Sequence, residues 1–112
     1  MINSRDKGKR GELEAAKAWS ELFGVELRRS QQFCGRSDDS DDIVGQPGVS
    51  LEVKRVQRIN VQRVVARAVD DAADDRVAVV MHRGDHQPWL VSLQLEDLPE
   101  LVRTLYLTMA EN

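Results

Sequence analysis

One short segment, residues 40–54, constrains the fold more than any other part of the chain. In an extended strand the side chains alternate between two faces, so Leu51 and Val53 can enter a core while Glu52 and Lys54 share the opposite face. The preceding Pro47-Gly48 suits the central positions of a type II turn, because glycine tolerates a positive φ there. The segment therefore predicts two strands, 41–44 and 49–54, joined by a tight turn.

The spacing of apolar residues predicts the remaining elements. Helical periodicity indicates helices over residues 6–23, 61–73 and 98–109, with Asn60 as the N-cap of the second. Strands are expected over 25–29, 77–81 and 89–93, and the apolar run 77–81 is typical of a strand buried on both faces. In the last helix, Leu98, Leu101, Val102, Leu105 and Met109 are expected to form one apolar stripe. The sequence predicts a single α/β domain over residues 1–112, in the order αβββαββα.

Charge and composition narrow the class of protein. The chain has 16 Lys and Arg against 19 Asp and Glu, a net charge of −3, yet basic residues gather near the beginning and over 54–67. A nucleic-acid partner therefore stays possible. No apolar run approaches the roughly 20 residues of a membrane span, and the first residues lack the apolar core of a signal peptide. With Cys34 as the single cysteine, we expect a cytoplasmic protein with no membrane association.

Three acidic residues are candidates for a shared metal site. Asp42 and Glu52 lie on neighbouring predicted strands across a short turn, and converging carboxylates are stabilised by a hard cation such as Mg²⁺. Glu12 lies on the flank of the first helix that faces the sheet, where a carboxylate needs a partner. Ordinary interpretations also exist, since Glu12 can pair with Lys9 and Glu52 with Lys54.

These residues carry a family resemblance. Lys7-Gly8-x-x-x-Glu12 opening a helix, Asp42-Ile43-Val44-Gly45 at a strand end and Glu52-Val53-Lys54 after a Pro-Gly turn resemble the PD-(D/E)XK nuclease superfamily. Within it, the chain is most similar to archaeal-type and phage-encoded Holliday junction resolvases. The resemblance implies a restriction-endonuclease-like core with a mixed central β-sheet flanked by helices. Asp41 stands where the family has proline, which leaves open whether Asp41 or Asp42 faces the metal.

The resemblance also implies an activity and its residues. It implies a Mg²⁺-dependent endonuclease, with Mn²⁺ able to substitute, that hydrolyses branched DNA in recombination or repair by attack of water. Asp42, Glu52 and the Val53 carbonyl would bind the metal, and Glu12 would complete the site directly or through water. Lys54 would lie beside the attacking water and stabilise the growing negative charge.

Basic and amide side chains around this site are candidate contacts to the DNA backbone, although each suits an ordinary surface equally well. They are Lys7, Lys9, Arg10, Arg28, Arg29, Gln32, Arg36, Arg55, Arg58 and Gln62. A homodimer formed through the last helix, including Tyr106 and Leu107, would present two symmetric sites. The alternatives are a nuclease of the same fold acting on nicked, flapped or duplex DNA in repair or restriction, and a non-catalytic module that binds DNA or protein.

Overall fold

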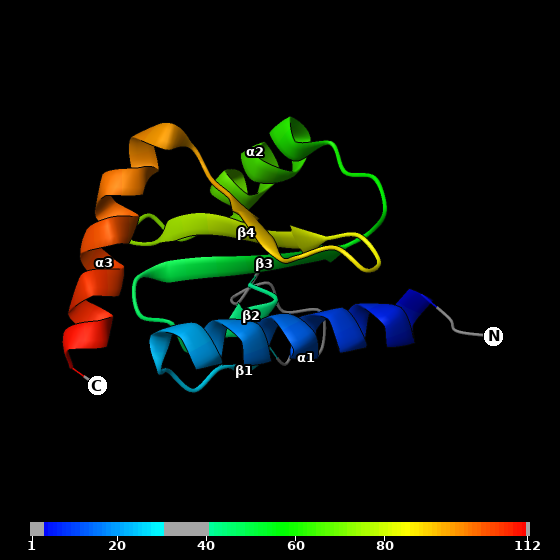
Figure 1. Ribbon diagram of the computed structural model, residues 1–112. Coiled ribbons are helices and arrows are strands. Elements are labelled where there is room, and N and C mark those ends of the chain that lie inside the picture. Colours follow the sequence, from blue (N-terminus) through cyan, green and yellow to red (C-terminus); the bar gives the residue numbers. More distant parts are fainter. Residues whose placement is uncertain (1–3, 31–40, 112) are drawn as a thin grey trace.

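The computed structural model describes residues 4–30 and 41–111 of the chain. Three α-helices flank a five-stranded mixed sheet (Figure 1). In chain order the elements are α1 (Ser4–Phe23), β1 (Arg28–Arg29), β2 (Ile43–Val44), β3 (Val49–Arg55), α2 (Val61–Asp71), β4 (Val77–Arg83), β5 (Leu90–Ser92), the 3₁₀ turn η1 (Leu95–Asp97) and α3 (Leu98–Ala110). The α/β class and the predicted order αβββαββα are confirmed, and η1 is an addition to them.

The strands lie side by side in the order β1-β2-β3-β4-β5. The central pair β3 and β4 is parallel, whereas every other neighbouring pair is antiparallel. A parallel pair needs a crossover connection, and α2 supplies it by returning the chain along the sheet, which Figure 1 shows. The prediction that β4 is buried on both faces is confirmed, because its residues 77–82 are all buried.

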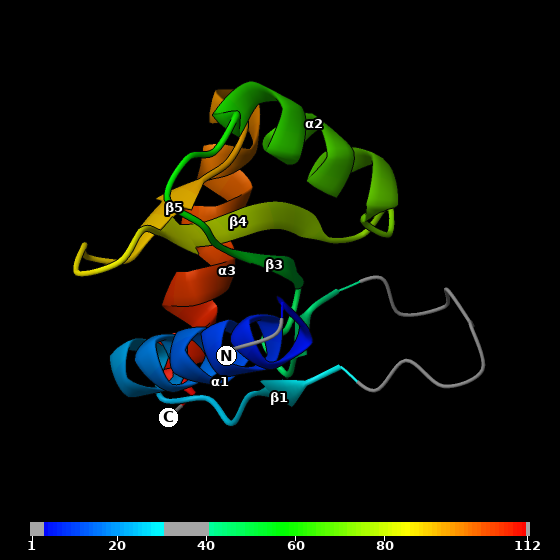
Figure 2. The ribbon, with the colours of Figure 1, turned by 90° about the vertical axis from the view of Figure 1, so that its right-hand side faces the viewer.

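Helices α1 and α2 cover opposite faces of this sheet (Figures 1 and 2). On the α1 face, Trp19 and neighbouring alanines of α1 pack in one core with Leu51 of β3 and Val79 of β4, and α3 adds Leu101. On the α2 face, a smaller cluster joins residues 65 and 68 of the helix to residues 78 and 80 of β4. The alternation predicted for residues 51–54 is therefore confirmed, with the apolar side chains turned toward α1.

The predicted turn at Pro47-Gly48 is present and also carries a buried polar bridge. Gly48 has φ of 75°, and the Val49 N–H donates to the Gln46 carbonyl at 3.4 Å. The buried side chain of Gln46 accepts from Trp19 Nε1 at 2.8 Å and donates to Thr108 Oγ1 at 3.0 Å. The turn thus ties α1 to α3.

Two expectations need correction. The strand expected over 25–29 is limited to Arg28–Arg29, because only these residues pair with β2. The expected apolar stripe of the last helix is mostly exposed: Leu101 is buried, but Val102 is 59% and Met109 48% exposed. The reason is that α3 lies across one end of the sheet, so only a narrow side of it meets the core (Figure 1). Within the described chain, no helix is both long enough and apolar enough to cross a membrane.

Candidate functional site

Asp42 is held rigidly immediately before β2. Its backbone N–H donates to the Leu51 carbonyl at 3.0 Å, and its own carbonyl accepts from the Ser30 N–H at 2.9 Å. Its carboxylate Oδ2 accepts from the Val53 N–H at 2.8 Å. The Asp42 carboxylate therefore accepts the Val53 N–H of β3, just beyond the Ile43–Leu51 pair that joins β2 to β3. These three bonds fix the direction of the Asp42 carboxylate.

Glu52 lies opposite Val80 on the α2 face of the sheet, and its carboxyl group meets that of Asp42. Burial, and after it the charge and hydrogen bond of Asp42, raise the pKa of Glu52 to about 8, with smaller contributions from the charges of Asp41 and Asp71. Glu52 is thus protonated at neutral pH and donates to Asp42. The two acids share a proton because two carboxylates this close cannot both stay ionised without a counter-charge.

The proton shared by Asp42 and Glu52 bears on whether these residues could bind a divalent cation. A proton held between two carboxylates marks a place where negative charge is concentrated and only partly compensated. Mg²⁺ prefers carboxylate and carbonyl oxygens, and the Val53 backbone is already bonded to Asp42. The donor set of Asp42, Glu52 and the Val53 carbonyl therefore has the chemistry that such an ion requires.

Glu12 belongs to a different contact. Its Oε1 accepts from Arg29 Nε at 2.8 Å, so the alternative pairing with Lys9 is replaced by a pairing with β1. Across residues 4–30 and 41–111, no three His, Cys, Asp or Glu side chains are placed to hold one ion together. The structure brings Asp42 and Glu52 together and does not bring Glu12 into a group with them.

The two adjacent aspartates are clearly distinguished. Asp41 is 4% exposed, and its Oδ2 accepts from Arg76 Nη1 at 2.9 Å. Asp42, in contrast, shares a hydrogen bond with Glu52. Of the two residues between which the sequence left a choice, Asp42 is the one that faces Glu52.

Lys54 is exposed on the same strand face as Glu52 and forms no ion pair with any described residue. It lies opposite His82 in the register of β3 and β4. His82 is buried, with Nε2 2.7 Å from Ser92 Oγ, and burial lowers its pKa. Lys54 is therefore an exposed amine two residues along β3 from Glu52.

The candidate DNA contacts divide into exposed and engaged side chains. Exposed are Lys9, Arg10, Arg28, Arg58 and Gln62. Arg29 pairs with Glu12, whereas Arg55 pairs with Glu14 at 3.1 Å and Asp85 at 3.2 Å, which ties α1 to the end of β3. The side chain of Lys7, and Gln32 and Arg36, lie outside the described residues.

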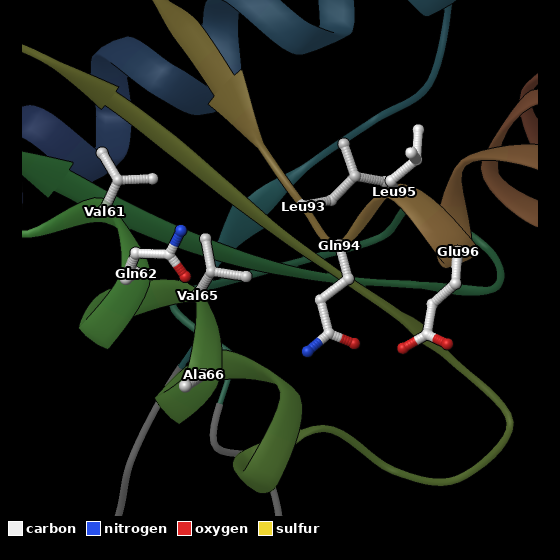
Figure 3. Close-up of a pocket in the computed structure, with 8 residues that line it drawn as sticks. All are labelled: Val61, Gln62, Val65, Ala66, Leu93, Gln94, Leu95 and Glu96. Atoms are coloured by element: carbon white, nitrogen blue, oxygen red, sulfur yellow. The ribbon is translucent and has the colours of Figure 1, made fainter.

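Gln62 lines a groove whose lining residues include neither Asp42 nor Glu52. It lines an open groove of about 630 Å³ between α2 and the segment that follows β5, which Figure 3 shows. The other residues at this groove are Val61, Val65, Ala66, Leu93, Gln94, Leu95 and Glu96. The predicted polar helper role of Gln62 in the candidate site stays a prediction.

Two residues near the site were not predicted from the sequence. Asp71, at the end of α2, is close enough to Glu52 for its charge to raise that pKa, and Arg76 binds Asp41. Asp71 follows Val64 by seven residues and so lies on the same side of the helix, which was the available signal. Nothing in the spacing connects Arg76 to Asp41, because the pair depends on how α2 crosses the sheet.

The chain matches no protein-family model, no curated protein and no solved structure. The features that bear on function are the carboxyl pair, the exposed Lys54 amine on the same strand face and the motifs of the sequence.

Proposed function

We propose that this protein is a Mg²⁺-dependent endonuclease with a restriction-endonuclease-like core, which hydrolyses phosphodiester bonds in branched DNA such as four-way junctions. The observation that carries the proposal is the proton-sharing pair Asp42 and Glu52, with the exposed Lys54 on the same strand face. The order of the motifs supports the nuclease class. The choice of branched DNA, and a role in cytoplasmic DNA recombination or repair, depend on the family resemblance alone.

Each residue has a distinct part in this reaction. Asp42 and the deprotonated Glu52 would hold the cation together with the Val53 carbonyl. A bound Mg²⁺ supplies an acidified water and neutralises charge on the scissile phosphate, and Mn²⁺ can take its place. The Lys54 amine, which no described side chain neutralises, would orient the attacking water and stabilise the negative charge that grows on the phosphate oxygens.

The surface offers contacts for both proposed partners. Lys9, Arg10, Arg28 and Arg58 are exposed and would bind backbone phosphates. The outer side of α3 leaves Val102, Tyr106, Leu107 and Met109 between 48% and 68% exposed, and we propose this side as the contact of a two-fold homodimer. Sedimentation that finds only monomer at micromolar concentration would contradict the dimer.

A substrate panel tests the activity. Labelled four-way junctions, flaps, nicked duplexes and intact duplexes are incubated with Mg²⁺ or with EDTA, and the cuts are mapped. We expect paired symmetric cuts in the junction, and a loss of about 100-fold or more in Glu52→Gln, because the amide removes a metal ligand. Glu96→Gln, an exposed acid beside the separate groove, is the matched control and should cleave normally. If no substrate is cleaved in a metal-dependent way, the proposal is wrong.

One observation favours a second candidate, a non-catalytic DNA-binding module that keeps this fold. Glu12 is engaged by Arg29, and the described residues contain no group of three acids suited to one ion. Such a module would bind the junction equally well with EDTA and with Mg²⁺, and Glu52→Gln would bind at least as tightly as the natural protein. A gel-shift titration beside the cleavage panel separates the two candidates.

A further inference from the structure

We propose that Arg76 is a positioning residue, whose ion pair with Asp41 fixes the chain at residues 41–42 so that the Asp42 carboxylate meets Glu52 and the Val53 N–H. The consequence for metal binding rests on the proposed function. The positioning itself stands on the contacts of the folded chain.

The ion pair joins a buried carboxylate to a guanidinium that is partly exposed. The Asp41 carboxylate is nearly buried, whereas the Arg76 side chain is 42% exposed and reaches it from the surface at 2.9 Å. A buried carboxylate is stabilised by a charged hydrogen-bond donor, so the pair resists separation. Removal of the partner from such a carboxylate costs much more than loss of an exposed ion pair.

The backbone around Arg76 is also fixed. The Arg76 N–H donates to the Ala73 carbonyl at 3.0 Å, and the following Val77 N–H donates to the Gly48 carbonyl at 2.9 Å. Arg76 therefore extends from a rigid point between α2 and β4. An ion pair from this fixed backbone to Asp41 therefore also restricts Asp42, the next residue in the chain.

Asp41 and Asp42 turn their carboxylates to different partners, Arg76 and the Val53 N–H. With Asp41 turned toward Arg76, the Asp42 side chain is directed to β3, where it accepts from Val53 N–H at 2.8 Å. Asp41 is close enough to Glu52 to act on it through its charge. Loss of Arg76 would remove the charged donor that binds Asp41, and with it one of the contacts that hold residues 41–42 in place.

Positioning and simple electrostatics make opposite predictions for a cation. Replacement of Arg76 by glutamine removes one positive charge near the acids, so electrostatics alone would tighten binding of a divalent ion. If Arg76 positions Asp42, the same replacement weakens binding, because one ligand loses its direction. The sign of the change therefore identifies the role.

The test compares Arg76→Gln, Arg76→Lys and Asp41→Asn with the control Arg103→Gln, which removes the same charge from an exposed pair with Glu100 on α3. Amide hydrogen exchange at Val53, measured by NMR in metal-free protein, reports the bond to Asp42. Titration with Mn²⁺ reports the site. We expect Arg76→Gln and Asp41→Asn to speed Val53 exchange about 10-fold and to weaken Mn²⁺ binding about 10-fold, with Arg76→Lys restoring most of both. Arg103→Gln should change neither.

Unchanged Val53 exchange in Arg76→Gln would overturn the proposal, and so would tighter Mn²⁺ binding. Equal acceleration at Val53 and at Val79 in the middle of β4 would overturn it as well, since the loss would then be global. Natural protein that neither binds Mn²⁺ nor cleaves DNA would refute the proposed function instead. In that case Val53 exchange alone still decides whether Arg76 positions Asp42.

Discussion

Strand β3 presents two faces of opposite chemistry. Toward α1 it turns Val49, Leu51 and Val53, which are buried in the larger core. Toward α2 it turns Ser50, Glu52 and Lys54, of which the first is buried, the second half-buried and the third exposed. The same stretch of chain therefore contributes to stability on one side and to the candidate chemistry on the other.

The difference shows where folding free energy is gained and where it is lost. The α1 face buries apolar side chains, which is the main favourable contribution to folding. The α2 face holds a carboxyl pair that cannot carry both of its charges without a counter-charge, and a buried Ser50 hydroxyl that has no hydrogen-bond partner in the described chain. Such groups cost stability, so the apolar cores on the two faces have to offset them.

Adjacent valines of β4 test most directly whether the two faces differ in packing. Val79 faces α1 and Val80 faces α2, and they are 0% and 1% exposed. We expect Val79→Ala to lower the free energy of unfolding by about 3 kcal/mol and Val80→Ala by about 1.5 kcal/mol, because the apolar cluster on the α2 face is smaller and can relax more easily around the lost methyl groups. Urea unfolding measures both. Equal losses would mean that the two faces are packed alike.

Glu52 makes the stability of the α2 face depend on pH. Its pKa rises from the ordinary 4.5 to about 8 in the fold, so the metal-free protein is most stable below pH 4.5 with respect to this group and loses that stability as the pH rises toward 8. Glu52→Gln removes the titration. We expect it to raise the free energy of unfolding by about 2 kcal/mol at pH 9, half of the full linkage because solvent screens a half-buried group.

The pH effect should disappear at pH 4, where natural Glu52 is neutral in both the folded and the unfolded chain. Thermal unfolding in EDTA across pH 4 to 9 measures it. Added Mg²⁺ at pH 9 should stabilise the natural protein and leave Glu52→Gln unchanged. A variant that is equally stable to the natural protein at every pH would show that the carboxyl pair is not strained.

Local patterns predicted the elements because their causes are local. Alternation around Leu51, the Asn60 cap with its Arg63 N–H donor, and Gly48 in the turn all act within a few residues, and each is present. The exposed side of α3 was not predicted, because apolar periodicity does not indicate how much of a helix packs against the rest of the protein. That depends on where the helix crosses the sheet.

The candidate site was predictable only in part, for the same reason. Asp42 and Glu52 converge because a turn joins their strands. Glu12 lies on α1, which covers the face opposite to α2, and spacing along a helix cannot state which face that helix covers. The Asp41–Arg76 pair joins residues brought together only by the crossover through α2, so no local pattern contains it.

Gln46 shows that the α1 face is not wholly apolar, and its replacement measures what the polar bridge contributes to stability. Gln46→Met keeps a similar volume but leaves the Trp19 indole N–H without its acceptor and Thr108 Oγ1 without its donor. We expect a loss of about 1.5 kcal/mol in the free energy of unfolding, typical of one buried donor left unsatisfied. Urea unfolding measures it, with Gln57→Met, which loses an exposed bond to the Asp85 N–H, as the matched control. A loss no larger than that of the control would contradict a buried bridge.

The smallest expected change in stability concerns Arg29. Its replacement tests whether Glu12 only pairs with Arg29 or also contributes to metal binding. The ion pair is partly exposed, so Arg29→Gln should lower the free energy of unfolding by less than about 1 kcal/mol. If Glu12 completes the metal site through water, freeing it should tighten Mn²⁺ binding about threefold, and Arg29→Gln combined with Glu12→Gln should lose that gain. Calorimetric titration of the two variants measures this. Unchanged affinity in Arg29→Gln would assign Glu12 to the α1 layer as an ion-pair partner alone, because a ligand released from a competing cation cannot leave the binding of a divalent ion unaffected.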